Sequence, residues 1–357
     1  MTEQSTIHSE LKTGILLLNL GTPDSTKTED VRRYLRQFLN DPKVLDMSPI
    51  GRALLLNLII LPFRPKKTAE AYESIWTERG SPLMMHSEDL TKGLQEHFDV
   101  PVKLAMRYGN PSVASVLDAF AAEEVDDIVV VPLYPHYAAS SFGTAVDHVM
   151  EEARIRWNVP NIRVFSPFYD KPEYIEALAR RIQESLDEYE PEKIMFSYHG
   201  IPEHHCSKSD TSGGQHCFKV ENCCDQIVPA NRHCYKAHCH QTTKAVVQEL
   251  DLKEDQYEIV FQSRLTKVPW IQPYADLRIN ELGQQGVKKL LVVCPSFVSD
   301  CLETLEEIEI RALEDFQENG GEELRLVPCL NSSDYWIEAL AQMLKVFMGE
   351  EPDRRAA

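Results

Sequence analysis

Short apolar segments alternate with longer segments of helical periodicity along most of the chain. The first apolar segment, residues 14–20, reads GILLLNL and ends at a Gly-Thr-Pro sequence. Nearly continuous apolar strands are typical of parallel sheets that helices cover on both faces, because neither face of such a strand meets water. Eight segments fit this description: Gly14–Leu20, Val102–Met106, Ile128–Leu133, Ile162–Phe165, Ile194–Ser197, Glu258–Gln262, Leu290–Cys294 and Leu324–Val327.

Helix-length segments lie between these strands, and they include residues 111–123, 172–189, 242–250 and 298–318. The alternation predicts an α/β fold with two four-stranded parallel sheets and a domain boundary near residues 167–172. A length of 357 residues also fits two domains.

The charge balance narrows the classes of function. The chain has 37 basic and 56 acidic residues, a formal net charge of −19, which argues against a nucleic-acid-binding protein. The strand ends carry neither the glycines of a dinucleotide fingerprint nor a phosphate-binding P-loop. The first ten residues contain no apolar segment of a secretory signal, so disulfides are not expected and the nine cysteines need another explanation.

Residues 49–67 form an apolar segment flanked by basic residues, PIGRALLLNLIILPFRPKK. The apolar stretch is too short to span a bilayer, and Pro49 and Pro62 are expected to bound it. A buried core helix is one interpretation. The other is an interfacial element that enters a membrane surface while its cations reach the head groups.

Two features point to chemistry with protons and a cation. His199 follows the strand at residues 194–197, and an imidazole placed there can accept a proton near neutral pH; a histidine satisfied within a turn is the alternative. Residues 298–318 predict a helix on which Asp300, Glu303 and Glu307 share one face. Such a stripe is either a solvated acidic face or a site for a hard cation and proton relay.

Six of the nine cysteines lie between Cys206 and Cys239, with the spacing C-x10-C-x5-C-C-x9-C-x4-C. Clustered thiols favour zinc or an iron–sulfur centre. The spacing lacks the paired C-x2-C of zinc ribbons, so iron–sulfur is the preferred interpretation over zinc. Cys294, Cys301 and Cys329 are expected in the core.

Taken together, the motifs resemble the ferrochelatase family, whose members insert Fe(II) into protoporphyrin. The resemblance rests on LLLNLGTPDS, MRYGNP, LYPHYAASS, SYHGIP, FQSRLTKVPWIQPYAD and CPSFVSDCLETLEEI, which occur here in the family's order. It implies two Rossmann-like domains, residues 12–170 and 171–334. The second domain would carry a Cys-rich insertion at 203–240, and a C-terminal helix at 335–350 would pack back on the first domain.

The resemblance also implies site residues. His199 and Glu303 match the family's essential histidine and glutamate, which also contact the substrate iron, and Asp300 and Glu307 match their acidic partners on a helix with a π-bulge. The porphyrin cleft would be lined by Leu20, Arg107, Tyr137, Ser140, Ser141 and Trp270. The insertion resembles that of bacterial members with an internal [2Fe–2S] cluster, which implies Cys217, Cys223, Cys224 and Cys234 as ligands and Cys206 as the reserve ligand.

The expected function is therefore insertion of Fe(II) into protoporphyrin IX to give protoheme with release of two protons. A coproporphyrin, cobalt or nickel chelatase of the same fold, and a non-catalytic heme or metal carrier, are the alternatives. The apolar segment at 49–67 resembles the family's active-site lip and predicts contact with a membrane surface. The expected location is the cytoplasm, peripheral on the inner membrane face, and both a monomer and a homodimer stay open.

Overall fold

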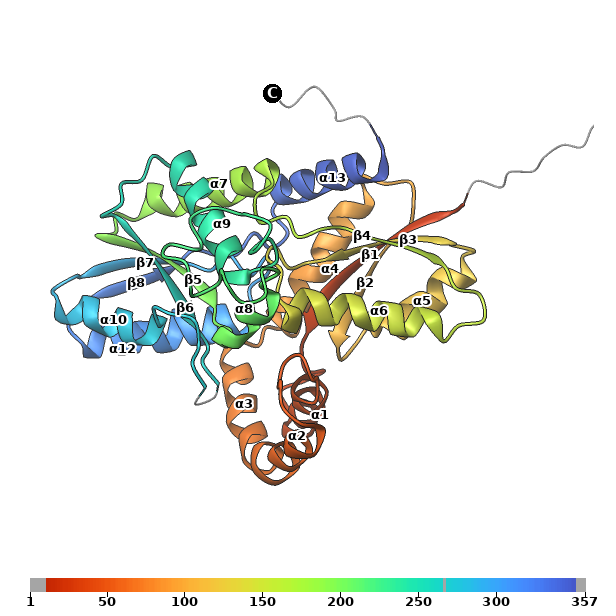
Figure 1. Cartoon of the computed structure of the whole chain (residues 1–357), viewed down its shortest axis with the longest axis horizontal. Helices are drawn as coiled ribbons and strands as arrows, with labels where there is room; N and C mark the ends of the chain where they lie inside the picture. Colours follow the sequence, from red (N-terminus) through yellow and green to blue (C-terminus); the bar gives the residue numbers. More distant parts are fainter. Residues whose placement is uncertain (1–10, 266–267, 351–357) are drawn as a thin grey trace, which may run out of the picture.

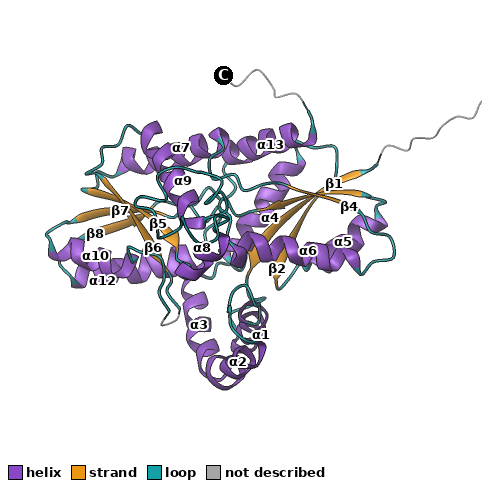
Figure 2. Ribbon diagram, in the orientation of Figure 1, coloured by secondary structure: helices purple, strands orange, loops and turns teal. Residues whose placement is uncertain are grey.

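A computed structural model describes residues 11–265 and 268–350. The first ten residues, where no signal sequence is expected, lie outside the described residues. Two four-stranded parallel sheets lie side by side, as Figures 1 and 2 show, with strand orders β2-β1-β3-β4 and β6-β5-β7-β8. Their strands are β1 (Thr13–Gly21), β2 (Val102–Tyr108), β3 (Asp127–Pro132), β4 (Asn161–Val164), β5 (Lys193–His199), β6 (Tyr257–Gln262), β7 (Lys289–Val293) and β8 (Glu323–Leu326).

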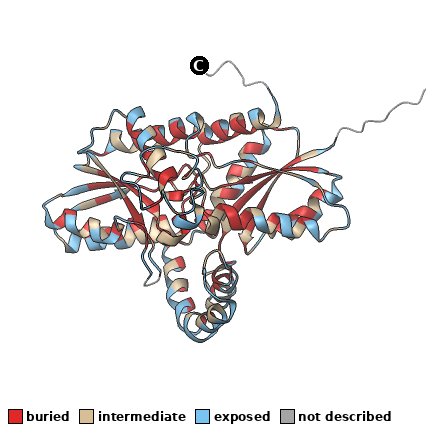
Figure 3. Cartoon of the chain, viewed as in Figure 1, coloured by how far each residue is buried: buried red, intermediate tan, exposed pale blue. Residues whose placement is uncertain are grey.

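All eight predicted strands are present, and the residues at the centres of β1, β3, β5 and β7, which lie inside the sheets, are buried. Ile15 pairs with both Val102 and Val129, and Phe196 pairs with both Ile259 and Val293. Figure 3 shows the buried residues concentrated in the two sheets and in the region where they approach each other. This confirms the predicted fold class, because continuous apolar strands are stable only when helices cover both sides.

Helices cover both faces of each sheet. Before the second sheet come α1 (Thr28–Leu39), α2 (Pro49–Leu55), the π-helical η1 (Leu56–Ile60), α3 (Leu61–Ile75), α4 (Pro82–Gln95), α5 (Val113–Ala122), the π-helical η2 (Ala139–Gly143), α6 (Thr144–Arg154) and α7 (Pro172–Glu188). The rest are α8 (Glu203–Ser209), α9 (Tyr235–Glu249), α10 (Ala275–Gln284), α11 (Leu302–Thr304), the π-helical η3 (Leu305–Ala312), α12 (Leu313–Glu318) and α13 (Asp334–Met348). The helix expected at residues 242–250 begins earlier, at Tyr235.

The last helix connects the two halves of the molecule. Helix α13 packs against α7 of the second half and α4 of the first (Figure 1). Contact with α4 is close, since a Cβ atom at Gly93 would lie 2.4 Å from Cδ1 of Ile337. One buried apolar cluster includes residues of both sheets and of α13, so the division into domains near residue 170 stays a prediction.

The segment at residues 49–67 projects from the body of the molecule as α2, η1 and the start of α3 (Figure 1). The expectation that Pro62 ends this segment is wrong. Pro62 lies in the first turn of α3, where a missing N–H is tolerated, and the helix continues to Ile75. Within residues 11–265 and 268–350, no helix is long and apolar enough to cross a membrane.

The outer side of this segment is exposed, which rules out the buried-core interpretation for the segment as a whole. The exposed fractions of Ile50, Leu58 and Phe63 are 76%, 65% and 77%. Leu56 and Leu61, in contrast, are buried in an apolar cluster that includes residues of α1. We call residues 49–67 the lip from here on.

Candidate active site

A cavity of about 770 Å³ opens where the carboxyl ends of β1 and β5 face each other. We call it the main cavity. Its volume lies in the range typical of small-molecule sites, roughly 300–1,000 Å³. Seven of the predicted site residues line it: Leu20, Ser140, Ser141, His199, Trp270, Glu303 and Glu307.

His199 is the last residue of β5, and its surroundings fix which ring nitrogen carries the proton. The backbone N–H of His199 donates a hydrogen bond to Ser296 Oγ at 3.0 Å. Nδ1 of His199 lies 2.6 Å from the carbonyl oxygen of Gly200. Because a carbonyl only accepts, Nδ1 is the donor and carries the hydrogen. In the neutral imidazole, Nε2 is then the nitrogen without a hydrogen and can accept a proton.

The turn after His199 requires glycine. A Cβ atom at Gly200 would lie 2.7 Å from the carbonyl oxygen of Gln262 and 3.3 Å from the ring of Trp270. The backbone N–H of Gly200 donates to the same Gln262 carbonyl at 2.8 Å. This close approach of β5 to β6 holds His199 at the cavity wall.

The two glutamates lie on the helical segment after β7. Glu303 belongs to α11 and Glu307 to η3, and both line the main cavity. Glu307 accepts hydrogen bonds from Ser263, from the backbone N–H at 2.9 Å and from Oγ at 2.6 Å. Burial raises the pKa of Glu307, and the negative charge of Glu303 adds to that rise. The hydrogen bonds from Ser263 oppose it, as does the positive charge that His199 carries when it is protonated. The three predicted groups are thus electrostatic neighbours.

Asp300 does not lie on a helix face with Glu303 and Glu307, contrary to what the sequence predicted. The helix begins at Leu302 rather than at Val298, and Cys301 is its N-cap residue, so Asp300 precedes the helix and does not continue the acidic stripe. Its carboxylate accepts hydrogen bonds from Asn331 Nδ2 at 2.6 Å, from the backbone N–H of Cys329 at 3.2 Å and from Thr304 Oγ1 at 3.2 Å. These bonds fasten the β7–α11 loop to the segment after β8, and Asp300 does not line the main cavity.

Arg107 and Tyr137 also lie outside the cavity lining. Nη2 of Arg107 donates to Asp41 Oδ2 at 2.6 Å, and Nε of Arg107 donates to Thr144 Oγ1 at 3.1 Å. The ring of Tyr137 lies 5.5 Å from that of His233, between ring centroids. A role of these two residues in porphyrin binding stays a prediction.

Four further cavity residues come from α1 and α3 and were not predicted as site residues from the sequence: Tyr34, Phe38, Arg64 and Tyr72. Burial is the main cause of the raised pKa of Tyr34 and of Tyr72, and the negative charge of Glu303 contributes to both. These side chains therefore face Glu303 across the cavity. The helical spacing of the two tyrosines with other apolar residues is an ordinary core signal, which is why it did not suggest a site.

The cysteine insertion gathers four buried thiols. The pKa of Cys234 is strongly lowered, chiefly because the thiols of Cys206, Cys217 and Cys224 hydrogen-bond to its sulfur. Cys223 is only partly buried, and its Sγ lies 3.9 Å from that of Cys224. The convergent set thus contains Cys206, the predicted reserve ligand, in the place predicted for Cys223.

Comparison with known proteins places this architecture in a class. The structure resembles SirB from Bacillus subtilis with Fe3+, with a TM-score of 0.54 and 13% identity over 96% of this chain and 100% of SirB. The sirohydrochlorin chelatase SirB in complex with cobalt gives a TM-score of 0.52 at 11% identity over 96% of this chain and 100% of that one. At such identities the likeness shows the fold alone, which is that of the chelatases.

Sequence comparison is more specific. The Ferrochelatase family model matches residues 12–346. Ferrochelatase of Coxiella burnetii (strain Dugway 5J108-111) is 44% identical over 336 residues, 94% of this chain and 93% of the relative. Ferrochelatase of Legionella pneumophila (strain Lens) is 42% identical over 339 residues, 94% of this chain and 99% of the relative. The chain belongs to the ferrochelatase family.

Proposed function

We propose that this chain inserts Fe2+ into protoporphyrin IX, releasing the two pyrrole protons and forming protoheme. The observation that carries the proposal is the main cavity itself. It brings His199, whose Nε2 is free to accept a proton in the neutral ring, together with the carboxylates of Glu303 and Glu307. A carrier protein needs only ligands that hold its cargo. A histidine that lies beside two glutamates in different environments can, in addition, transfer protons.

The residues have distinct roles in this proposal. His199 Nε2 accepts a proton from a pyrrole nitrogen. Glu303 and Glu307 accept the second proton and guide the ferrous ion, which accepts carboxylate oxygens as ligands. Burial raises the pKa of Glu307, which brings its affinity for a proton closer to that needed near neutral pH. No net oxidation takes place, because Fe2+ replaces two protons.

Substitutions at these positions test the proposal. We expect His199→Ala to bind porphyrin normally, detected by quenching of porphyrin fluorescence, and to lose about 10²–10⁴-fold in kcat for Fe2+ insertion. Glu303→Gln should lose activity to a similar degree. Glu309→Gln is the matched control, because Glu309 is exposed on the same helical segment and does not line the cavity. Normal turnover of the His199 variant would remove it from the mechanism.

The lip favours protoporphyrin IX over a more polar tetrapyrrole, because its exposed apolar side chains, such as Phe63, adjoin Arg64, the lip residue that lines the main cavity. An anaerobic assay with Fe2+, run beside coproporphyrin III and with Co2+ or Ni2+ in place of iron, distinguishes the alternatives. We expect the highest kcat/KM for Fe2+ and protoporphyrin IX. A higher value for coproporphyrin III would assign the chain to the other porphyrin substrate.

We also propose that the insertion binds a [2Fe–2S] cluster through Cys206, Cys217, Cys224 and Cys234. Within residues 11–265 and 268–350, no three thiols lie within 4.8 Å of one another. A single tetrahedral zinc would need sulfurs roughly 3.8 Å apart, so the wider thiol set suits a two-iron centre better. When bound, the cluster would supply Fe–S bonds that hold the insertion together, and the proton and metal transfer described above does not involve it.

Finally, we propose that the lip contacts a membrane surface, from which protoporphyrin IX reaches the cavity. The location that we propose is the cytoplasm, peripheral on the inner membrane face. Support comes from the exposed apolar side chains of the lip and from the exposed Lys66 and Lys67 beside them, which suit anionic head groups.

A further inference from the structure

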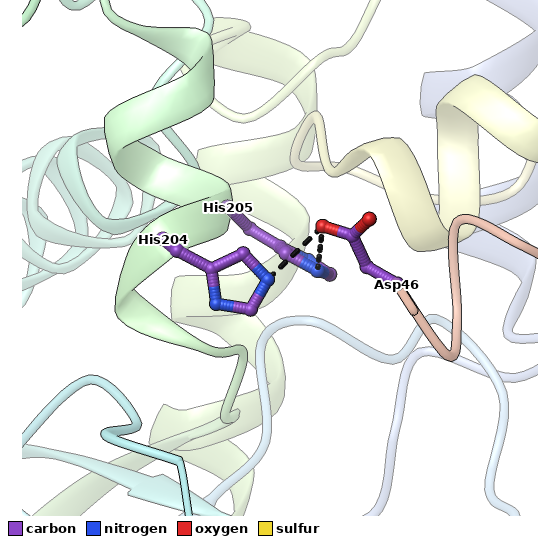
Figure 4. Close-up of side chains that lie close together, drawn as sticks. All are labelled: Asp46, His204 and His205. Carbon is purple, nitrogen blue, oxygen red and sulfur yellow. Dashed lines mark hydrogen bonds and ion pairs between the residues drawn. The ribbon is translucent and has the colours of Figure 1, made fainter. Parts of the chain in front are cut away.

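A second cavity, of about 410 Å³, lies beside the main cavity, and His205 lines both. Its other lining residues include Asp46, from the segment between α1 and α2, and Lys208, from α8. Asp46, His204 and His205 form a compact group there, which we call the Asp46 cluster. Figure 4 shows both imidazoles projecting from one helix towards the Asp46 carboxylate on a separate segment.

The geometry of the Asp46 cluster is close to that of a metal site. Nε2 of His204 lies 3.0 Å from Asp46 Oδ2, and Nε2 of His205 lies 3.9 Å from the same oxygen. All three ligand atoms lie within 4.8 Å of one another. A divalent ion with bonds of about 2.0–2.2 Å needs ligand atoms roughly 3 Å apart, so small side-chain movements would complete its coordination.

The chemistry of the side chains fits a transition metal. Two imidazoles and one carboxylate are the ligand set of many non-heme Fe(II) centres. His205 is buried, and its Nδ1 has no hydrogen-bond partner in the part of the chain that the structure describes. Burial lowers the pKa of His205 to about 4, which leaves this imidazole neutral, as a metal ligand must be.

One cation competes for the same carboxylate. Lys208 Nζ forms an ion pair with Asp46 Oδ2, and the side chain of Lys208 is 63% exposed. Lys43, the other lysine of the second cavity, pairs with Asp147 instead. An incoming divalent ion therefore has to displace a single flexible lysine, which can move into solvent at little cost.

We propose that Asp46, His204 and His205 form a second site for a divalent transition-metal ion such as Fe2+, at the wall shared with the main cavity. The site lies outside the group formed by His199, Glu303 and Glu307. It is testable in a protein that cannot catalyse, so its failure and the failure of the proposed function are separate results.

The test uses the full chain with His199→Ala, Glu303→Gln and Glu307→Gln as background, so that the carboxylates proposed to guide Fe2+ do not bind the probe, and Mn2+ as the probe. Mn2+ prefers oxygen and nitrogen ligands to thiolates, and the loss of its free signal in electron paramagnetic resonance counts bound ions. We expect one bound Mn2+ per chain that His204→Ala abolishes and Asp46→Asn weakens at least tenfold. Fe2+ added anaerobically should release the bound Mn2+.

Two further variants separate a metal site from a merely structural ion pair. Lys208→Ala should tighten Mn2+ binding about fivefold, because it removes the competing cation. His97→Ala is the matched control, since His97 also pairs with a carboxylate, that of Glu338 at 3.7 Å, and binding should not change. Equal Mn2+ binding with and without His204, or a Lys208→Ala protein that loses thermal stability without binding Mn2+ more tightly, would overturn the proposal.

Discussion

The exposed side chains of the lip make membrane attachment a quantitative prediction. Full burial of an isoleucine, leucine or phenylalanine side chain contributes about 1.5–3 kcal/mol. Ile50, Leu58 and Phe63 expose 76%, 65% and 77% of their surface, so together they offer the equivalent of about two fully exposed apolar side chains. Their removal should therefore cost at least about 3 kcal/mol of partition free energy, or at least about 100-fold in the partition coefficient.

The assay is co-sedimentation with vesicles that contain a third of anionic lipid. The variant replaces Ile50, Leu58 and Phe63 together by serine. Because all three side chains are exposed, we expect little change in the folding free energy, within about 0.5 kcal/mol for each substitution. Raising the salt concentration should weaken binding of the unmodified protein further, since it screens the lip lysines.

The chain offers a matched control for apolarity alone. Ile155, Trp157 and Val159, after α6, expose 71%, 99% and 62% of their surface, so their replacement by serine removes a similar exposed apolar area elsewhere on the molecule. We expect this control to bind vesicles like the unmodified protein. If both triple variants lose binding equally, or if the lip variant keeps its binding, the lip does not carry the attachment.

Three further predictions concern the site and its supports. Cys206→Ser should abolish the visible absorbance of the iron–sulfur centre and its iron, about two per chain, whereas Cys223→Ser should keep both; the opposite result would restore Cys223 as the ligand. Because burial raises the folded-state pKa of Glu307 above 4.5, its stabilising contribution is lost as pH rises from 4.5 through the raised value. Glu307→Gln should therefore melt at a progressively higher temperature than the unmodified protein as pH rises from 5 to 8, and parallel melting curves would contradict this. Gly21→Ala should fail to fold or melt far lower, because φ is +111° and a Cβ would lie 1.8 Å from the Tyr108 carbonyl oxygen; normal melting would show that the backbone adapts.

Local sequence was sufficient to predict the strands and the position of His199. A continuous apolar segment such as residues 14–20 can be stable in few environments other than a covered parallel sheet, and a histidine directly after such a strand has its position fixed by the sheet. Asp300 was different. Its hydrogen-bond partners, Cys329 and Asn331, come from the segment after β8, so its role depends on contacts about 30 residues away that periodicity does not encode.

The cysteine ligands show the same limit. Spacing identified a cluster of thiols, but Cys223 and Cys224 are adjacent and only one of them joins the convergent set. Cys206, on α8, belongs to the convergent set because its thiol lies next to that of Cys234. Ten residues separate Cys206 from Cys217 in the sequence, and this spacing gives no sign that the two thiols converge. The choice between the two candidates is made by tertiary packing.

The π-helical segments explain why periodicity alone could not give the layout of the acidic residues. A regular α-helix repeats every 3.6 residues, and that repeat is the assumption behind a stripe of carboxylates at residues 300, 303 and 307. The structure instead has a short α11, followed by η3 with wider turns, and Glu303, Glu306 and Glu307 all line the cavity. Another π-helical segment, η2, contributes Ser140 and Ser141 to the same cavity. Single π-turns occur frequently at functional sites, and here both segments bring polar side chains to the cavity wall.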